Sequence, residues 1–241
     1  MGKVQVIFKK EEIKPGEMAG KTAVVFDVLF ATTTITAALA DGAVSVIPVL
    51  TGAQAREKAK TFKEPYVLAG EDQGKTLEGF HHPLRTFLQP VVKNKHLILS
   101  TTNGTVALQR SSQADHLYAA SLLNNQAVAR RLYEEHRHDT ILLICSGTSG
   151  DFTMEDFFGA GSLMNELLKL GKWDMSDAAR TALLFYRGIH QTSVELLRST
   201  RIGQLLIELG MDPVEINFAS QEGIFDTIPK YDPEEGQLKE D

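Results

Sequence analysis

The stretch LILSTTNGTVAL, residues 97–108, joins two apolar runs through three threonines, an asparagine and a glycine. Residues 97–99 are typical of the end of a buried strand, and residues 106–108 are the first apolar positions of a helix. The polar residues lie at the joint between the two. A strand that passes directly into a helix is the repeating unit of an α/β fold, so this stretch indicates the fold class.

The same alternation runs along most of the chain. Strand-like runs occur at TAVVFDVL, VSVIPVL, YVLAG, HLYAAS and TILLIC, and helix-like segments include AQAREKAKTF and NNQAVARRLYEEH. Near-continuous apolar strands that alternate with helices predict a three-layer α/β/α fold with a largely parallel or mixed sheet. After Gly150 the chain is predicted to be mainly helical, with one candidate strand at VEINFAS, residues 214–220.

Length and local composition suggest how the chain is organised. A chain of 241 residues suits one α/β unit, and we expect a single domain over 1–241. The acidic segment DPEEGQLKED, residues 232–241, lacks apolar anchors and is expected to fray. The late helices carry ample apolar surface, and we therefore hypothesise that the protein forms a homodimer.

Composition and charge exclude several classes of protein. With 43% apolar and 23% charged residues, the chain is typical of globular proteins. A net charge of -6 without clusters of Lys and Arg argues against a nucleic-acid partner. No apolar stretch reaches the roughly 18 residues of a membrane span, and MGKVQVIFKK lacks the apolar region of a signal peptide. We therefore expect a cytoplasmic protein without membrane contact, in which Cys145 is a buried structural thiol.

The joint at 101–108 has a counterpart earlier in the chain. TTTITAAL, residues 32–39, and TTNGTVAL, residues 101–108, share five of eight positions, and each follows an apolar strand. The match indicates an internal duplication, two copies of one structural solution, or chance. A third joint, CSGTSGD, follows ILLI. We expect the three joints to lie side by side at the carboxyl end of the sheet, where open α/β folds bind ligands.

Threonines and a glycine at a helix start can bind an anion, because the first N–H groups of a helix have no partner within it. The structural alternative is that the threonines and asparagine only cap the helix and the glycine only relieves a turn. The candidate residues for binding substrate oxygens are Thr32, Thr33, Thr101, Thr102, Asn103 and Gly104.

Acidic residues form the second candidate group. Asp27 interrupts the apolar run VVFDVL, where a carboxylate is costly without a cation, and Glu71 also follows a strand. Glu155 and Asp156 begin the MEDFF helix, where Thr153 and Asp156 also fit a purely structural capping box. Carboxylates without Cys or His at ligand spacing favour Mg²⁺ over zinc. Asp72, which follows the same strand as Glu71, and Asp151, which flanks the start of the MEDFF helix, belong to the same candidate group.

Spacing excludes several known mechanisms. GEDQGKT, residues 70–76, is one residue too short between its glycines for a P-loop, and a cysteine phosphatase would need arginine at Asp151. An aspartyl-nucleophile phosphatase of the haloacid type would need an acid at Leu29, and neither G-x-S-x-G nor H-E-x-x-H occurs. A hydrolase that uses His81 or His82 instead of a metal stays open as an alternative.

The order and spacing of DVLFATTTITAALADGA, GEDQGKTLEGF, STTNGTVAL, CSGTSGDFTMEDFFGAG and SDAARTALLFY resemble the 2-phosphosulfolactate phosphatase family. The resemblance extends over about residues 24–229. It implies an α/β/α fold and Mg²⁺-dependent hydrolysis of 2-phosphosulfolactate to sulfolactate, a step of coenzyme M synthesis in methanogens. It also implies that the characteristic acids are Asp27, Glu71, Glu155 and Asp156, and that residues 101–104 form the anion loop.

The chain departs from that pattern at positions where the family usually carries arginine. Phe30 follows DVL, and Val106 follows TTNGT; in addition, HHP replaces the family's G-N-S-P. Arginine is the natural partner of phosphate, sulfonate and carboxylate groups. Candidates to compensate are Lys75, Arg85, Arg180 and Arg187. The leading hypothesis is a Mg²⁺-dependent phosphatase for a small anionic ester, in which Asp27, Glu71 and Asp156 hold the metal and Glu155 is the general base. The alternatives are a changed substrate and a non-catalytic anion-binding or regulatory protein.

Overall fold

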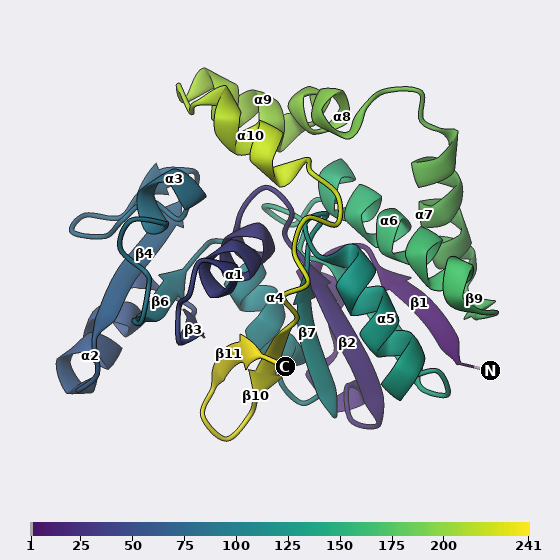
Figure 1. The fold of residues 1–241 in the computed structure, drawn as a ribbon, viewed down its shortest axis with the longest axis horizontal. Coiled ribbons are helices and arrows are strands. Elements are labelled where there is room, and N and C mark those ends of the chain that lie inside the picture. Colours follow the sequence, from purple (N-terminus) through teal and green to yellow (C-terminus); the bar gives the residue numbers. More distant parts are fainter. Residues whose placement is uncertain (1) are drawn as a thin grey trace.

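The computed structural model describes residues 2–241 and contains one large mixed sheet, mostly parallel, with helices packed on both of its faces (Figure 1). This arrangement confirms the predicted three-layer α/β/α fold. The strands are β1 (Lys3–Ile7), β2 (Lys21–Phe26), β3 (Ser45–Val49), β4 (Tyr66–Asp72), β5 (Lys75–Thr76), β6 (His96–Ser100), β7 (His116–Ala120), β8 (Thr140–Cys145), β9 (Asp174–Met175), β10 (Pro229–Asp232) and β11 (Gln237–Glu240).

The helices follow the strands in the predicted alternation up to residue 170. They are α1 (Ala31–Ala40), α2 (Gly52–Thr61), α3 (Arg85–Leu88), α4 (Gly104–Ser111), α5 (Asn125–Glu135), α6 (Met154–Leu170), α7 (Asp177–Gly188), α8 (Ser193–Ser199), α9 (Arg201–Glu208) and α10 (Pro213–Ala219), with two short 3₁₀ turns, η1 (Lys10–Glu12) and η2 (Pro15–Glu17). Within residues 2–241 no helix is both long and apolar enough to cross a membrane.

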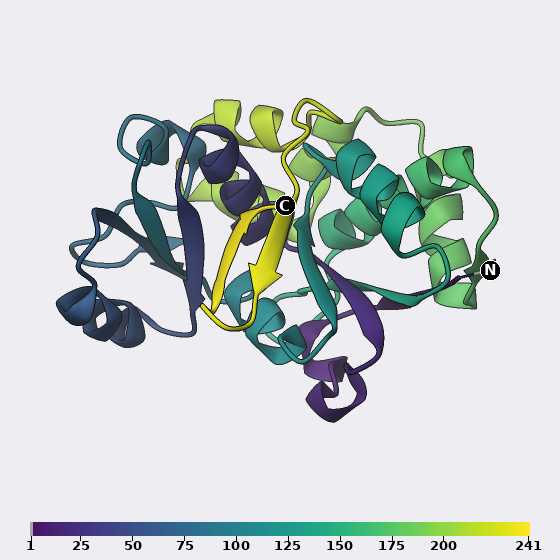
Figure 2. The same cartoon turned by 60° about the horizontal axis from the view of Figure 1, so that its bottom comes forward.

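The strand order is β5-β4-β6-β3-β11-β10-β7-β2-β8-β1-β9. One parallel group contains β4, β6 and β3, and a second contains β7, β2, β8, β1 and β9. The antiparallel hairpin of β10 and β11 connects them by pairing with β7 on one side and β3 on the other (Figure 2). The sheet is therefore continuous only because the C-terminal segment joins its middle.

The core has two large layers because successive strand side chains point to opposite faces of the sheet. In β2, Val24 and Phe26 pack with residues of α5, α6 and α7 in one cluster, whereas Ala23 and Val25 belong to a second cluster with α4. Cys145, at the end of β8, is fully buried, which confirms the expected structural thiol. Burial raises the pKa of this thiol well above its ordinary value, which keeps it protonated and unreactive.

The C-terminal segment does not fray, and the prediction for residues 232–241 is wrong. Leu238 of β11 is fully buried and pairs with Val46, while Lys230 of β10 pairs with Tyr118. The Ser45 hydroxyl also donates a 2.6 Å hydrogen bond to Gln237 Oε1. One leucine in a polar segment is a weak sequence signal, but the gap between β3 and β7 offers it a fully apolar position.

Replacing Leu238 with alanine is expected to lower the free energy of unfolding by about 2–4 kcal/mol, because it leaves a cavity where the two strand groups meet. Chemical denaturation measures the change. Leu209→Ala is the matched control: Leu209 is exposed, so its replacement should change the stability by less than about 0.5 kcal/mol. Equal effects of the two variants would show that the hairpin contributes nothing to the core.

The segment VEINFAS also differs from its prediction. It forms helix α10 rather than a strand, with Asp212 as its N-cap and Pro213 in the first turn. The Asp212 carboxylate accepts a 2.9 Å hydrogen bond from the Val214 N–H. An acidic N-cap followed by proline is a helix-start signal that outweighs the β-branched composition here.

Candidate active site

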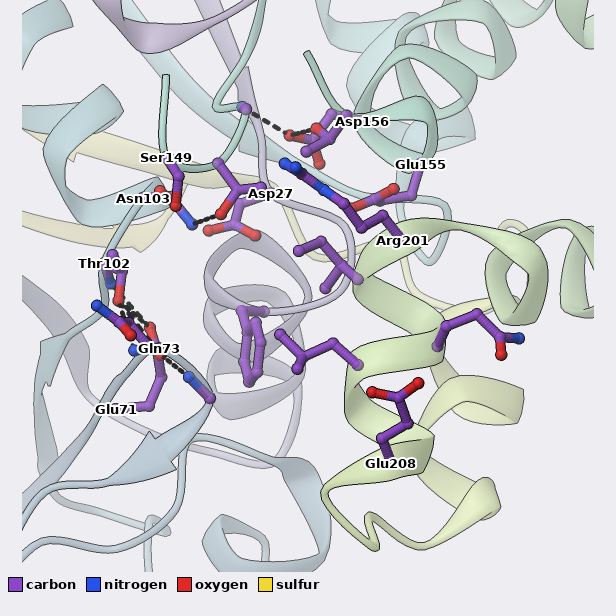
Figure 3. Close-up of a pocket in the computed structure, with 18 residues that line it drawn as sticks. Asp27, Glu71, Gln73, Thr102, Asn103, Ser149, Glu155, Asp156, Arg201 and Glu208 are labelled. Carbon is purple, nitrogen blue, oxygen red and sulfur yellow. Dashed lines mark hydrogen bonds between the residues drawn. The ribbon is translucent and has the colours of Figure 1, made fainter. Parts of the chain in front are cut away.

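A pocket of about 470 Å³ lies where the segments after β2, β4, β6 and β8 meet helix α9. Asp27 and Glu71 lie at strand ends, Glu155 and Asp156 lie at the start of α6, and α9 with Arg201 and Glu208 forms the opposite side (Figure 3). The lining residues are Asp27, Phe30, Glu71, Gln73, Gly74, Thr102, Asn103, Gly147, Thr148, Ser149, Thr153, Glu155, Asp156, Arg201, Ile202, Gln204, Leu205 and Glu208. All four acids predicted from the sequence therefore face one cavity.

Asp27 is held by the helix that follows β6. The Gly104 N–H at the start of α4 donates a 2.8 Å hydrogen bond to Asp27 Oδ2. A Cβ atom at Gly104 would lie 2.5 Å from both Asp27 Oδ2 and the Ala31 Cβ, so only glycine fits. The strands β3, β11, β10 and β7 separate β6 from β2 in the sheet, yet this contact brings their carboxyl ends together.

Glu71 is held by the other end of the same joint. The Thr102 N–H donates a 2.8 Å hydrogen bond to Glu71 Oε1, and the Gly74 N–H donates a 2.7 Å bond to Oε2. The Thr102 hydroxyl lies 3.1 Å from Oε1. The β4–β5 turn that carries Gly74 is thereby fixed against the β6–α4 joint.

Asp156 connects the β2–α1 joint to the β8–α6 joint. Its Oδ1 accepts a 2.9 Å hydrogen bond from the Val28 N–H, and its Oδ2 accepts from the Gly147 N–H at 3.1 Å and the Thr153 hydroxyl at 2.7 Å. The Thr153 side chain caps no helical N–H, so the capping-box alternative does not describe this contact. Burial outweighs these hydrogen bonds and raises the pKa of Asp156 to about 6.

Glu155 lies beside Arg201, across the pocket from Glu71 (Figure 3). The side chain is almost completely buried. Burial and the neighbouring charge of Asp156 raise the pKa of Glu155 to about 8, against the opposing effects of a hydrogen bond from Thr200 and the charge of Arg201. A carboxyl group with a pKa near neutrality can both take up and release a proton, as acid–base catalysis requires.

The pKa of Asp27 is subject to opposing influences, like that of Glu155. Burial, together with the charges of Asp156 and Glu71, raises its pKa well above the ordinary value. Hydrogen bonds from the N–H groups of Ala31 and Gly104 act in the opposite direction. Acids that repel one another in a buried pocket favour the binding of a cation, because a cation relieves that repulsion.

The joint at 101–104 does hold an anion, but the anion is part of the protein. The N–H groups of Thr102 and Gly104 donate to Glu71 and Asp27, as described above. Thr102 and Asn103 line the pocket, whereas Thr101 and Gly104 do not. The Thr101 hydroxyl instead accepts a 3.3 Å hydrogen bond from the Thr105 N–H. Thr101 and Gly104 therefore position the site rather than face a substrate.

Thr32 and Thr33 do not line the pocket either. The Thr32 hydroxyl accepts a 2.9 Å hydrogen bond from the Asp27 N–H, and the Thr33 hydroxyl donates a 2.6 Å bond to the Val28 carbonyl. Their predicted role in binding substrate is not supported, because both hydroxyls are used within the joint.

The two similar segments are also not structurally equivalent. Helix α1 begins one residue before the TTTITAAL match, whereas α4 begins three residues into TTNGTVAL. Identical residues of the two segments therefore occupy different positions relative to the two helix starts. The sequence similarity does not reflect a repeated structural unit.

Sequence reasoning missed two cations near the site. The Lys10 Nζ donates a 2.9 Å hydrogen bond to Asn103 Oδ1, and the Asn103 amide donates to the Thr148 hydroxyl at 3.1 Å. Arg201 lines the pocket and forms a 3.1 Å ion pair with Asp151. Lys10 lies in the charged run KKEE, which is typical of a solvated surface, so no local signal distinguishes it.

The residues considered as replacements for the missing arginines do not line the pocket. Arg85 forms a bidentate pair with Asp41, with both N–O distances at 2.8 Å, and Arg187 donates to Asn165. His81 and His82 also lie outside the pocket lining. A mechanism based on these histidines therefore has no support in the geometry.

The family model described as 2-phosphosulpholactate phosphatase matches residues 7–234 of the chain. The chain belongs to the 2-phosphosulfolactate phosphatase family. A Clostridium perfringens (strain SM101) protein named "Probable 2-phosphosulfolactate phosphatase" is 36% identical, over 98% of this chain and 96% of its own. Proteins with the same name from Clostridium acetobutylicum and Thermotoga petrophila are 33% and 36% identical, covering 95% and 87% of this chain and 97% and 88% of their own.

Membership of the 2-phosphosulfolactate phosphatase family confirms the resemblance seen in the sequence. It also gives the two departures from the family pattern a place in the fold. Phe30 lines the pocket and lies in the same β2–α1 joint as Asp27, whereas Val106 lies on α4 outside the lining. Of the two changes, only Phe30 alters the pocket surface.

Proposed function

We propose that this protein is a Mg²⁺-dependent phosphatase that hydrolyses a small anionic phosphate ester, 2-phosphosulfolactate or a close relative of it. The observation that carries the proposal is the convergence of Asp27, Glu71, Glu155 and Asp156 on one pocket from the ends of β2 and β4 and the start of α6. The names of the family and its curated relatives support the reaction class.

The metal would be held by Asp27, Glu71 and Asp156. Within residues 2–241 no three or more His, Cys, Asp or Glu side chains form a ready metal-binding group. The donor chemistry still fits Mg²⁺, which keeps several waters and needs only one or two carboxylates, and the buried acids here repel one another. Bound Mg²⁺ would polarise the phosphoryl group and supply an oriented water.

The other pocket residues have roles that follow from their positions. Thr102 and Asn103 lie beside Glu71 and Asp27 and would contact phosphoryl oxygens, and Lys10 fixes the orientation of Asn103. Glu155, with its pKa near neutrality, would take a proton from the attacking water, as the general base.

Phosphate release from 2-phosphosulfolactate and a panel of other phosphate monoesters tests the proposal. We expect release with Mg²⁺ and a loss of at least about 100-fold when EDTA removes the metal, because the acids then repel the anionic substrate. Readdition of Mg²⁺ should restore the rate. A folded protein that binds these esters with a raised Tm but releases no phosphate would instead be a non-catalytic binding protein.

A further inference from the structure

One wall of the pocket is apolar, although the other walls carry acids. Phe30 from the β2–α1 joint and Ile202 and Leu205 from α9 line the pocket. Ile202 packs against the apolar cluster that contains Phe30, and Leu205 lies on the same face of α9 as Ile202 because the two are three residues apart. Leu205 is 38% exposed, and Phe30 is 8% exposed. Removing apolar side-chain surface from water is favourable. This wall therefore favours contact with an apolar group of a ligand.

The charge of the pocket limits what else a ligand can carry. Five carboxylic acids line it: Asp27, Glu71, Glu155, Asp156 and Glu208. Among the described lining residues, Arg201 is the only lysine or arginine. Figure 3 shows Arg201 beside Glu155 and Glu208 further along α9. The α9 side therefore offers one cation and an apolar surface, with an acid at its far end.

A permanently charged sulfonate fits this wall poorly. Against Phe30, Ile202 and Leu205 it would lose water contacts without a hydrogen-bond donor to replace them, and Glu208 would repel it. Arg201 can neutralise one carboxylate, and its ion pair with Asp151 holds the guanidinium at the pocket edge. A branched alkyl or aryl group would instead bury apolar area on both itself and the wall.

We propose that Phe30, Ile202 and Leu205 form an apolar subsite, and that the preferred substrate class is the phosphate ester of a 2-hydroxy acid with an alkyl or aryl side chain. The ester's carboxylate contacts Arg201, and its side chain packs against the apolar wall. This inference rests on the proposed phosphatase function and narrows its substrate.

The test compares kcat/KM of the Mg²⁺-loaded protein for three esters that share one phosphorylated 2-hydroxy acid core. These are 2-phosphosulfolactate, 2-phospholactate and the 2-phosphate of 2-hydroxy-4-methylpentanoate. We expect the branched alkyl ester to exceed 2-phosphosulfolactate by about 10-fold or more, which is the discrimination that a small apolar pocket supplies. A preference for 2-phosphosulfolactate would overturn the inference while leaving the phosphatase proposal intact. No release from any ester would reject both.

Substitutions at Leu205 and Phe30 test whether the apolar wall causes the substrate preference. Leu205→Arg and Phe30→Arg should each lower kcat/KM for the alkyl ester about 10-fold and raise it for the sulfonate. Leu205 is partly exposed, so its variant serves if Phe30→Arg fails to fold. Ile207→Ala is the matched control, because Ile207 lies on α9 but not in the pocket lining, and its preference should equal the wild type's. Unchanged preferences in both arginine variants would overturn the subsite.

Discussion

Asp27→Asn is expected to lower kcat/KM by about 1,000-fold or more while the protein stays folded. The substitution keeps the shape of the side chain but removes the charge that would bind Mg²⁺, and a loss of this size equals about 4 kcal/mol of transition-state stabilisation. Stability should not fall, because the change removes the repulsion of Asp27 by Asp156 and Glu71. Phosphate release and thermal unfolding measure the two effects.

Asp226→Asn is the matched control for this variant. The Asp226 side chain is 92% exposed and pairs with Arg130, and neither residue lines the pocket, so the replacement should leave turnover unchanged. Added Mg²⁺ should raise the Tm of the wild type and of the control, and raise that of Asp27→Asn by a smaller amount. Wild-type turnover in a folded Asp27→Asn protein would rule out Asp27 as a metal ligand.

The second large effect is expected from Gly104→Ala, a change of one methyl group at a residue that does not touch the pocket. The new Cβ would lie 2.5 Å from both Ala31 Cβ and Asp27 Oδ2, distances that force the β2 and β6 joints apart. We expect the free energy of unfolding to fall by about 1–3 kcal/mol. We also expect phosphate release to fall at least about 100-fold, because a shift of Asp27 by a fraction of an ångström disturbs the site.

The control for this variant is Gly16→Ala, where a Cβ would meet nothing within 4 Å. Its stability should stay within about 0.5 kcal/mol of the wild type. Ala31→Gly in the Gly104→Ala background removes the clash with the Ala31 Cβ and should recover part of the stability. If Gly104→Ala alone is as stable and as active as the wild type, then Gly104 does not connect the two joints as closely as the structure indicates.

The sequence predicted much of the fold because periodicity reports burial locally. Strand-length apolar runs and 3.6-residue periodicity located β2, β3, β4, β6, β7 and β8 and the longer helices before residue 170, but not β1, β5 or the short helix α3. Two segments were predicted with the wrong structure, and their conformation depends on distant partners or on a cap. Residues 232–241 become ordered only because Leu238 fills the space between β3 and β7, and α10 follows from its Asp212–Pro213 start.

The candidate site was predicted in part, for an equally physical reason. Carboxylates at strand ends stand out from apolar surroundings, so Asp27 and Glu71 are visible in the sequence alone. The partner of a helix N-terminus is not visible, because the donor and the acceptor come from different segments. The free N–H groups of Thr102 and Gly104 were therefore expected to bind a substrate anion, whereas in the folded chain they donate to Glu71 and Asp27.

By itself, the sequence determined the alternation of strands and helices, the joints where chemistry can occur and the acids that those joints carry. These properties depend on residues near one another in the chain. Only the tertiary structure decided how the C-terminal hairpin joins the two parallel strand groups and how Lys10 reaches Asn103. It also decided how α9 brings Arg201 and an apolar wall to the acids. Each is a contact between distant segments, and local preferences carry no information about such partners.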